Sequence, residues 1–259
     1  MIGHVSLVGA GPGAPDLLTI RAARRLAEAD LVLYDALCAP EVRMMAPEAR
    51  WFYVGKRAGR ESISQAAINR LLVRAARRGF CVVRLKSGDP FVLGRGGEEA
   101  LALVDAGIPF EVIPGVSSVV AAPGLAGIPL THRGLASGFL VVSGHTEAAY
   151  AAALEGLQPA SVTVVVLMGL GARGAIAAKL LERGWEAGTP AAIVGGAATS
   201  EAWRWLGRLD ALAAAEIPPG GAPGLLVIGA VTALAPALQA QFGQLAANEQ
   251  RREADAANE

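Results

Sequence analysis

The stretch RLKSGDPFVLGRGGEEA, residues 84–100, decides the fold class. It starts inside an apolar run at 80–85, passes through a glycine-rich loop, and ends in a helical pattern from Gly96 to Ala106. Glycine at 88 lets a ligand approach the backbone closely, and Asp89 can accept hydrogen bonds from it. A buried strand, a loop and a helix in this order predict an α/β protein whose ligand lies at the strand ends.

The same loop also fits a plain tight turn that is capped by Asp89. Arg95 and the pair Glu98–Glu99, one turn further along the chain, favour a binding site over a bare turn.

Strands and helices alternate through the first half of the chain. We expect strands at 4–9, 30–35, 80–85 and 108–113, in a mostly parallel sheet. Four helices are expected between and after them: one at 16–29, one that Ser62 caps and Gly79 ends, one at 96–106 and one at 117–126. The segment GIPLTHRGLASG, 127–138, interrupts this alternation of strands and helices and is the candidate linker between the two domains. Beyond it, the apolar runs at 190–195 and 202–209 leave no room for a helix between them, which predicts a mixed second sheet. The expected division is an N-terminal domain at 1–132, a C-terminal domain at 133–245 and a polar tail at 246–259.

Charge and cysteine content restrict the function classes. The 259 residues include 23 Lys and Arg and 23 Asp and Glu, so the net charge predicts neither nucleic-acid nor membrane binding. Cys38 and Cys81 lack CxxC spacing and the chain shows no signal peptide, which favours a reduced, cytoplasmic protein. The three histidines lie far apart in the sequence, so we expect no metal site.

The first strand runs into a second glycine-rich turn, SLVGAGPGAPDLLTI at 6–20. It resembles the phosphate-binding turn of a dinucleotide enzyme, and Asp35 lies about where a ribose-binding acid would follow. Pro12 argues against that interpretation, because proline has no backbone N–H to direct at a phosphate. These residues alone leave open whether the turn binds a dinucleotide or a different adenosine compound.

Six sequence blocks together resemble one family: VGAGPGAPDLLT, LYDALCAPE, YVGKRAG, RLKSGDPFVLGRGGEE, IPGVSS and GIPLTHRG. They are similar to the uroporphyrinogen-III C-methyltransferases of the tetrapyrrole methylase family, over residues 3–234 and in the same order. The resemblance implies two α/β domains with S-adenosylmethionine (SAM) in the cleft between them, and a homodimer. It implies methylation of uroporphyrinogen III at carbons 2 and 7, which gives precorrin-2, the branch point to sirohaem, cobalamin and haem d1.

The resemblance also assigns roles to matching residues. The implied SAM site comprises Pro12, Ser87, Gly88, Asp89, Val92, Ser117, Ser118, Met168, Ala197, Pro223 and Gly224. The implied catalytic residues are Asp35 as proton acceptor, Lys56 as donor, and Arg95. The implied substrate-binding residues are Arg95, Glu98, Arg133 and Met168. Lesser candidates for pairing with the substrate carboxylates are Lys56, Arg57 and Arg60.

Several of these residues have a second interpretation. Ser117 also fits a helix cap and Met168 a core position. Arg95 is a poor base at its ordinary pKa, so a role as clamp for a substrate carboxylate is favoured. Ser87 and the pair Ala197–Ala198 replace residues that are more usual in the family, namely glycine and glycine–threonine.

Three rival functions remain open at this point. The first is a sister enzyme that methylates a later precorrin. The second is a tetrapyrrole- or SAM-binding protein without turnover, and the third is a nicotinamide dehydrogenase.

Overall fold

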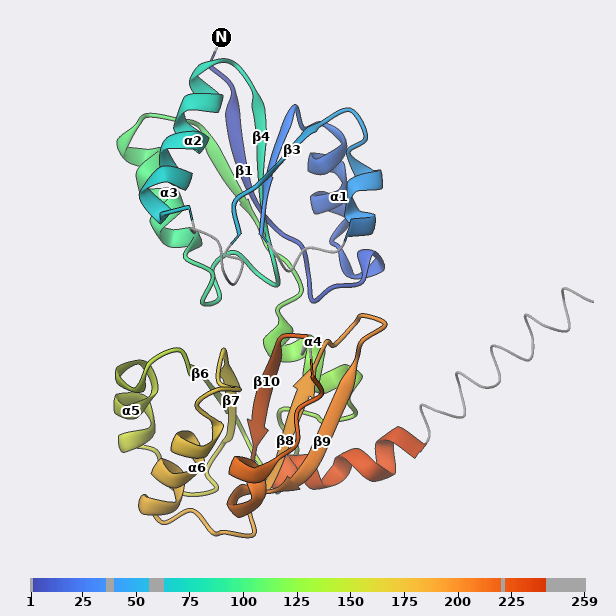
Figure 1. Ribbon diagram of the computed structural model, residues 1–259, viewed down its shortest axis with the longest axis vertical. Coiled ribbons are helices and arrows are strands. Elements are labelled where there is room, and N and C mark those ends of the chain that lie inside the picture. The colour runs from blue at the N-terminus through green and yellow to red at the C-terminus, as the bar shows by residue number, and fades with distance from the viewer. Residues whose placement is uncertain (1, 36–39, 56–62, 220–221, 241–259) are drawn as a thin grey trace, which may run out of the picture. The chain divides into compact units, whose positions relative to one another are not determined.

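The computed structural model describes residues 2–35, 40–55, 63–219 and 222–240. By its internal contacts the chain divides into two compact units, residues 1–118 and 119–259. Each unit contains one five-stranded sheet (Figure 1). The linker that the sequence analysis expects at 127–138 lies inside the second unit, and its role as a domain boundary stays a prediction.

The sheet of the first unit is parallel throughout, with the strand order β3-β2-β4-β1-β5. Its strands are β1 (His4–Gly9), β2 (Leu31–Tyr34), β3 (Arg50–Tyr53), β4 (Cys81–Lys86) and β5 (Phe110–Ile113). Strand β3 was not expected from the sequence, since its residues, RWFY, include the exposed Arg50 and Phe52 and do not form a buried apolar run.

Helices cover both faces of this sheet, which is why its strands are apolar on both sides. Helices α2 (Gln65–Arg77) and α3 (Gly96–Asp105) pack on the face that holds Leu7 and Val82, and α1 (Ile20–Ala27) packs on the face of Val8 and Val83. Short 3-10 helices occupy Pro15–Leu17 and Pro40–Met45.

Two of the expected helix starts are wrong. The Ser64 side chain, rather than Ser62, caps α2 by accepting a hydrogen bond from the Ala67 N–H at 3.3 Å. The helix expected at 16–29 is split, because Thr19 adopts an extended conformation and its hydroxyl caps α1 through the Ala22 N–H. In both cases a hydroxyl side chain just inside the expected range accepts the hydrogen bond that starts the helix.

The sheet of the second unit is mixed, as expected, with the order β6-β7-β10-β8-β9. Its strands are β6 (Phe139–Ser143), β7 (Thr163–Leu167), β8 (Pro190–Gly195), β9 (Trp203–Arg208) and β10 (Gly224–Ile228). Only β6 and β7 pair in parallel, while β8 and β9 form the antiparallel pair that the short connection predicted.

The helices of the second unit lie on opposite faces of its sheet. Helices α5 (Glu147–Glu155) and α6 (Arg173–Glu182) pack on the face of Val164 and Ile193, and α4 (Ser118–Leu125) packs on the face of Val165 and Val194. Two 3-10 helices, Leu209–Ala214 and Ala230–Leu234, follow β9 and β10.

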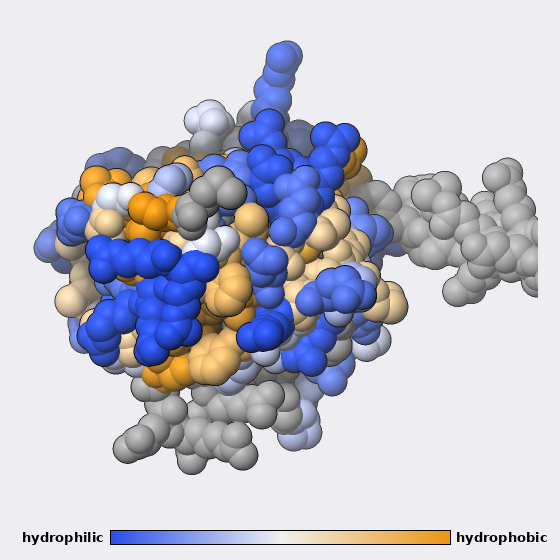
Figure 2. Space-filling model, turned by 90° about the horizontal axis from the view of Figure 1, so that it is seen from above, coloured by the Kyte–Doolittle hydropathy of each residue, from blue (hydrophilic) through white to orange (hydrophobic). Residues whose placement is uncertain are grey.

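The face shown in Figure 2 mixes hydrophilic and hydrophobic side chains. No helix within the described residues is long and apolar enough to cross a bilayer.

Candidate active site

Three loops of the first unit leave the carboxyl edge of its parallel sheet side by side. The register pairs Gly9 of β1 with Lys86 of β4, and Val8 with Ile113 of β5, so the segments after these strands start at one level. The first two loops are joined by their backbones: Gly11 donates to the Gly88 carbonyl at 3.2 Å, and Gly88 donates to the Gly11 carbonyl at 2.7 Å. The predicted SAM-binding turns therefore form one continuous structure.

Glycine makes this close packing possible. A Cβ atom on Gly9 would lie 2.5 Å from Cα of Gly115 and 2.6 Å from the carbonyl oxygen of Gly88. A Cβ on Gly115 would likewise overlap that oxygen. Gly88 has a positive φ of 65°, a conformation that suits glycine, and the nearest atoms to a Cβ there would be the amide nitrogen and hydroxyl of Ser118, both at 3.6 Å. The three loops thus meet backbone to backbone.

Asp89 holds two of these loops together. One carboxylate oxygen accepts a hydrogen bond from the Phe91 N–H at 2.8 Å, and the other accepts from the Gly115 N–H at 3.1 Å. A carboxylate oxygen has two lone pairs, so each can accept one further bond from a ligand. Both interpretations made from the sequence therefore fit: the residue caps its turn and remains able to bind.

Beyond Asp89 the loop presents apolar side chains and one cation. Phe91, Val92 and Leu93 are exposed, and Leu93 and Arg95 both have positive φ angles, of 52° and 59°.

Arg95 precedes α3, and its guanidinium contacts the Glu98 carboxylate through two hydrogen bonds of 2.8 and 2.7 Å. This geometry fits a role for Glu98 in orienting Arg95. Hydrogen bonding to Glu98 raises the pKa of Arg95, which strengthens the case against Arg95 as a base.

Asp35 follows β2 at the same edge, and its side chain is 29% exposed. Its carboxylate accepts a hydrogen bond of 2.7 Å from the guanidinium of Arg84, which is itself buried. Behind Arg84 lie two further buried charges, Lys86 and Glu99.

The sequence analysis did not single out these three residues as a group. A usable signal was present, because Arg84 and Lys86 alternate with Leu85 on a strand expected to be buried on both faces, where charged side chains are rare unless paired.

The predicted site residues of the second unit share one edge of its sheet. Leu167 pairs with Leu225 and Gly195 with Gly224, so Met168, Ala197 and the Pro223–Gly224 segment lie at the same end. The Gly196 N–H donates to the Pro223 carbonyl at 3.0 Å. Met168 has a φ of 57° and is 51% exposed, which excludes the core interpretation of this side chain.

Arg133 lies at the opposite end of the second unit's sheet from Met168. Gly138 accepts a hydrogen bond from the Thr163 N–H, at the amino end of β7, and a pocket there is lined by Thr131–Ser137 together with Ser161. Met168 directly follows the carboxyl end of β7. The structure therefore does not bring these two predicted substrate contacts together within the unit.

Three of the predicted cationic residues, Lys56, Arg57 and Arg60, lie outside the described residues. Ser117 and Ser118 are half-buried where the loop after β5 enters α4. Pro12 and Ser87, also half-buried, lie in the first two loops of the carboxyl edge. No group of three or more His, Cys, Asp or Glu side chains that could hold a metal occurs in the part of the chain that the structure describes.

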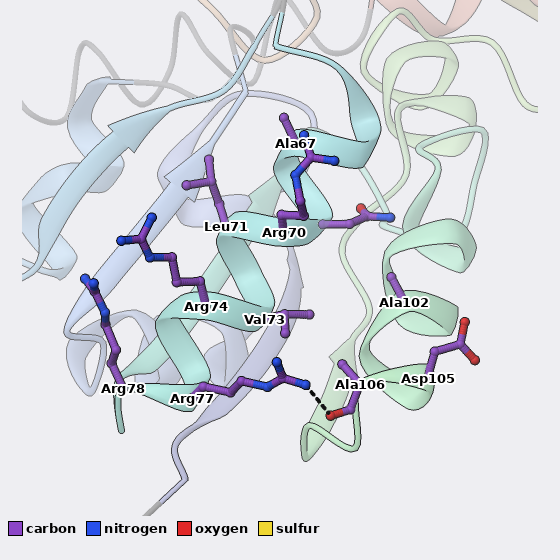
Figure 3. A pocket seen from close by; sticks show the side chains of 11 residues that line it. Ala67, Arg70, Leu71, Val73, Arg74, Arg77, Arg78, Ala102, Asp105 and Ala106 are labelled. Atoms are coloured by element: carbon purple, nitrogen blue, oxygen red, sulfur yellow. Dashed lines mark hydrogen bonds between the residues drawn. The ribbon is translucent and has the colours of Figure 1, made fainter.

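A separate pocket lies between α2 and α3 (Figure 3). It is lined by Arg70, Arg74 and Arg77 of α2 and by Arg78, which directly follows α2, and Arg77 donates to the Ala106 carbonyl at 3.5 Å. None of the predicted site residues contributes to this pocket, so it is distinct from the loops at the carboxyl edge.

Known proteins resemble the chain over most of its length. Residues 4–213 match the family model of the Tetrapyrrole (Corrin/Porphyrin) Methylases. Uroporphyrinogen-III C-methyltransferase of Methanobacterium ivanovii is 44% identical over 225 residues, which cover 86% of this chain and 95% of that protein.

A longer relative and a solved structure agree with this match. Siroheme synthase of Chromobacterium violaceum is 44% identical, and the chain spans about half its length: the match covers 90% of this chain and 50% of that protein. The crystal structure of uroporphyrin-III C-methyl transferase from Thermus thermophilus, complexed with S-adenyl homocysteine, is 45% identical with a TM-score of 0.76 and covers 88% of this chain and 98% of its own. With its parallel and mixed sheets and its glycine-rich carboxyl edge, the chain belongs to the tetrapyrrole methylase family.

Proposed function

We propose that this chain transfers methyl groups from SAM to carbons 2 and 7 of uroporphyrinogen III, giving precorrin-2. The observation that carries the proposal is the backbone-to-backbone meeting of three glycine loops, tied together by Asp89. Relatives about 44% identical are named uroporphyrinogen-III C-methyltransferases, and a structure 45% identical holds S-adenyl homocysteine.

The residues present fit an adenosyl co-substrate. Glycines at the loop contacts keep the backbone uncovered, and the free lone pairs of Asp89 can accept hydrogen bonds from hydroxyl or amino groups. We propose Pro12, Ser87, Gly88, Asp89, Val92, Ser117 and Ser118 in the first unit, and Met168, Ala197, Pro223 and Gly224 in the second, as the SAM contacts. That SAM lies between the two units stays a prediction.

SAM supplies an electrophilic methyl group when bound. An electron-rich pyrrole carbon attacks that methyl carbon, so a carbon–carbon bond forms, the carbon–sulfur bond breaks, and S-adenosylhomocysteine leaves with the electron pair. Holding the two reactants near attack distance removes on the order of 7–11 kcal/mol of the barrier. The protein's main contribution is therefore positioning.

The macrocycle must then lose a proton, and the proposed acceptor is Asp35. Its carboxylate is partly exposed at the strand edge and is held by Arg84. A placed base contributes about 10²–10⁴-fold to the rate. Lys56 is proposed as the donor, by resemblance alone.

Substrate binding needs cations, because uroporphyrinogen carries eight carboxylates. Arg95 is exposed at the loop end, and its pairing with Glu98 fixes its orientation while leaving part of its donor set free. Arg133 and Met168 are the other proposed substrate contacts, although they lie at opposite ends of one sheet.

We also propose that the chain acts as a homodimer in the cytoplasm, with no metal, nucleic acid or membrane as partner. The family resemblance supports the dimer, and the balanced net charge and the cysteine spacing support the rest.

Incubation with enzymatically made uroporphyrinogen III and methyl-labelled SAM tests the function. Two labelled methyl groups per macrocycle and two equivalents of S-adenosylhomocysteine are expected, with none in the absence of protein. Product with no label would contradict the proposal.

A parallel experiment separates the rival functions. Label appearing only on a later precorrin would favour the sister enzyme. Equilibrium dialysis that shows NADH bound in place of SAM would favour the dehydrogenase.

A further inference from the structure

Four charged side chains form a connected network beneath the candidate site. Arg84 donates through Nε to Glu99 at 2.9 Å and through its terminal nitrogen to Asp35 at 2.7 Å. The Lys86 ammonium lies 3.1 and 3.0 Å from the two oxygens of Glu99. Gln65 of α2 adds a hydrogen bond to Glu99 at 3.1 Å. Two cations thus balance two carboxylates in one cluster.

Most of this network is buried in an apolar face. Arg84, Lys86 and Glu99 are 2%, 3% and 0% exposed, and they lie on the face where Val82 and Leu103 pack. Burial, together with the charge of Arg84, lowers the pKa of Lys86 despite the contact with Glu99. Apolar residues of similar volume usually stabilise such a position at least as well as buried ion pairs do. Folding stability alone is therefore a weak explanation for these charges.

The network connects two parts of the proposed catalytic machinery. Asp35 follows β2, whereas Glu99 lies in the first turn of α3, directly after the Glu98 that holds Arg95. One guanidinium contacts both carboxylates, so the position of Asp35 and the position of the first turn of α3 depend on the same group.

Lys86 links the network to the loop above it. The backbone of Gly94 lies over the Lys86 side chain, and a Cβ on Gly94 would be 3.5 Å from Lys86 Cε. The Gly96 N–H closes the loop by donating to the Pro90 carbonyl at 3.0 Å. The loop that carries Arg95 therefore passes close to the end of the Lys86 side chain.

We propose that Arg84, with Lys86 and Glu99, is a positioning group that fixes Asp35 and Arg95 relative to each other. It touches neither co-substrate nor substrate. This inference rests on the proposed function for the roles of Asp35 and Arg95, but the network itself does not depend on the identity of the substrate.

The decisive variant is Arg84→Lys, which keeps the positive charge but cannot contact both carboxylates as a planar fork does. The matched control is Arg25→Lys, because Arg25 pairs with Glu28 and Glu111 in the same unit, away from Asp35. We expect Arg84→Lys to lower kcat at least tenfold while KM for SAM changes less than about twofold. We expect the control to change neither.

A double-mutant cycle with Asp35→Asn tests whether Arg84 acts through Asp35. If it does, Arg84→Lys lowers kcat in the wild-type background but has little further effect in the Asp35→Asn background. Equal fold-losses in both backgrounds would overturn the proposal, as would a loss explained entirely by a smaller folded fraction.

Amide hydrogen exchange gives a readout that does not need turnover. Arg84→Lys, and Lys86→Met as a second variant, should speed exchange in residues 87–99, while Arg25→Lys leaves that segment unchanged. Unchanged exchange in both network variants would refute the positioning role. If the wild-type chain transfers no methyl group to uroporphyrinogen III, the proposed function fails, and hydrogen exchange still decides on the network.

Discussion

Replacing Gly9 with alanine should separate the loops that form the proposed SAM site. The added Cβ would lie 2.5 Å from Cα of Gly115 and 2.6 Å from the Gly88 carbonyl oxygen, and ordinary contact starts at 3.4 Å. The loops after β4 and β5 must therefore move by about 0.9 Å. Because the obstructing atoms belong to the backbone, no side chain can rotate away to relieve the overlap.

This displacement has a cost in stability and a larger cost in function. Overpacking of this kind costs about 1–3 kcal/mol. In a chain of this size, that corresponds to a fall in Tm of roughly 2–12 °C. A shift of about 1 Å in a positioned site costs on the order of 10²-fold in rate. We expect Gly9→Ala to raise the Kd for S-adenosylhomocysteine at least tenfold and to lower methyl transfer about 10²-fold.

Calorimetric titration with S-adenosylhomocysteine and thermal unfolding of the same preparations measure both effects. Gly97→Ala is the matched control, because a Cβ at this exposed position in α3 meets nothing within 4 Å. Alanine within a helix is favoured over glycine by about 0.5–1 kcal/mol, so the control should keep or raise Tm and bind normally. A lower Tm with unchanged affinity in Gly9→Ala would show that the loops pack together but do not bind SAM. Unchanged Tm and affinity would refute the packing argument itself.

Three further substitutions test individual side chains. Arg95→Ala should abolish turnover while the affinity for S-adenosylhomocysteine stays within about threefold in a binding titration, because the Arg95 guanidinium pairs with Glu98 and is proposed to bind the substrate. A normal rate would remove Arg95 from the mechanism. Asp89→Asn should weaken S-adenosylhomocysteine binding, because the single amide oxygen replaces only one of the two oxygens that accept from the Phe91 and Gly115 N–H groups. Equal affinity would argue against a role for Asp89 in holding the two loops together. Hydrogen bonding to Arg25 lowers the pKa of Glu111 below its ordinary 4.5, so this pair stabilises the fold above that pH and the gain is lost as the pH falls through the pKa in the folded state. Thermal unfolding from pH 7 to pH 3 should therefore show a smaller loss of Tm for Glu111→Gln than for the wild type.

Much of the fold follows from patterns within single segments. The apolar runs of β1, β4 and β10 are long enough to identify buried strands, and the short connection between β8 and β9 excludes a crossover helix. β3 was not predicted because its residues alternate between exposed and half-buried and form no apolar run. The predicted cap of α2 was wrong because two serines, Ser62 and Ser64, lie two residues apart. The hydrogen bond that the Ala67 N–H donates to the Ser64 hydroxyl identifies Ser64 as the cap.

The candidate site was predictable where it depends on the loops and unpredictable where it depends on register. Gly88 and Asp89 are identifiable from the sequence because a glycine followed by an acid after a buried strand is a local signal. That the Asp89 carboxylate bonds the Gly115 amide is set by the pairing of β1 with both β4 and β5, which no local pattern contains. The placement of Arg133 away from Met168 has the same origin, since it depends on the direction of β7 within the second sheet.

The buried network shows that charged residues within a buried strand indicate ion pairs inside the unit. A strand covered on both faces by helices offers no water to Arg84 or Lys86, so each must find an anionic partner inside the unit. Glu99 of α3, the helix packed over β4, pairs with both cations. A second nitrogen of the Arg84 guanidinium donates to Asp35, which follows β2, and the third donates to the carbonyls of Leu33 and Leu85. The two cations of RLK thus pair with one acid on α3 and one acid after β2, contacts that arise because α3 packs over β4 and β4 pairs with β2.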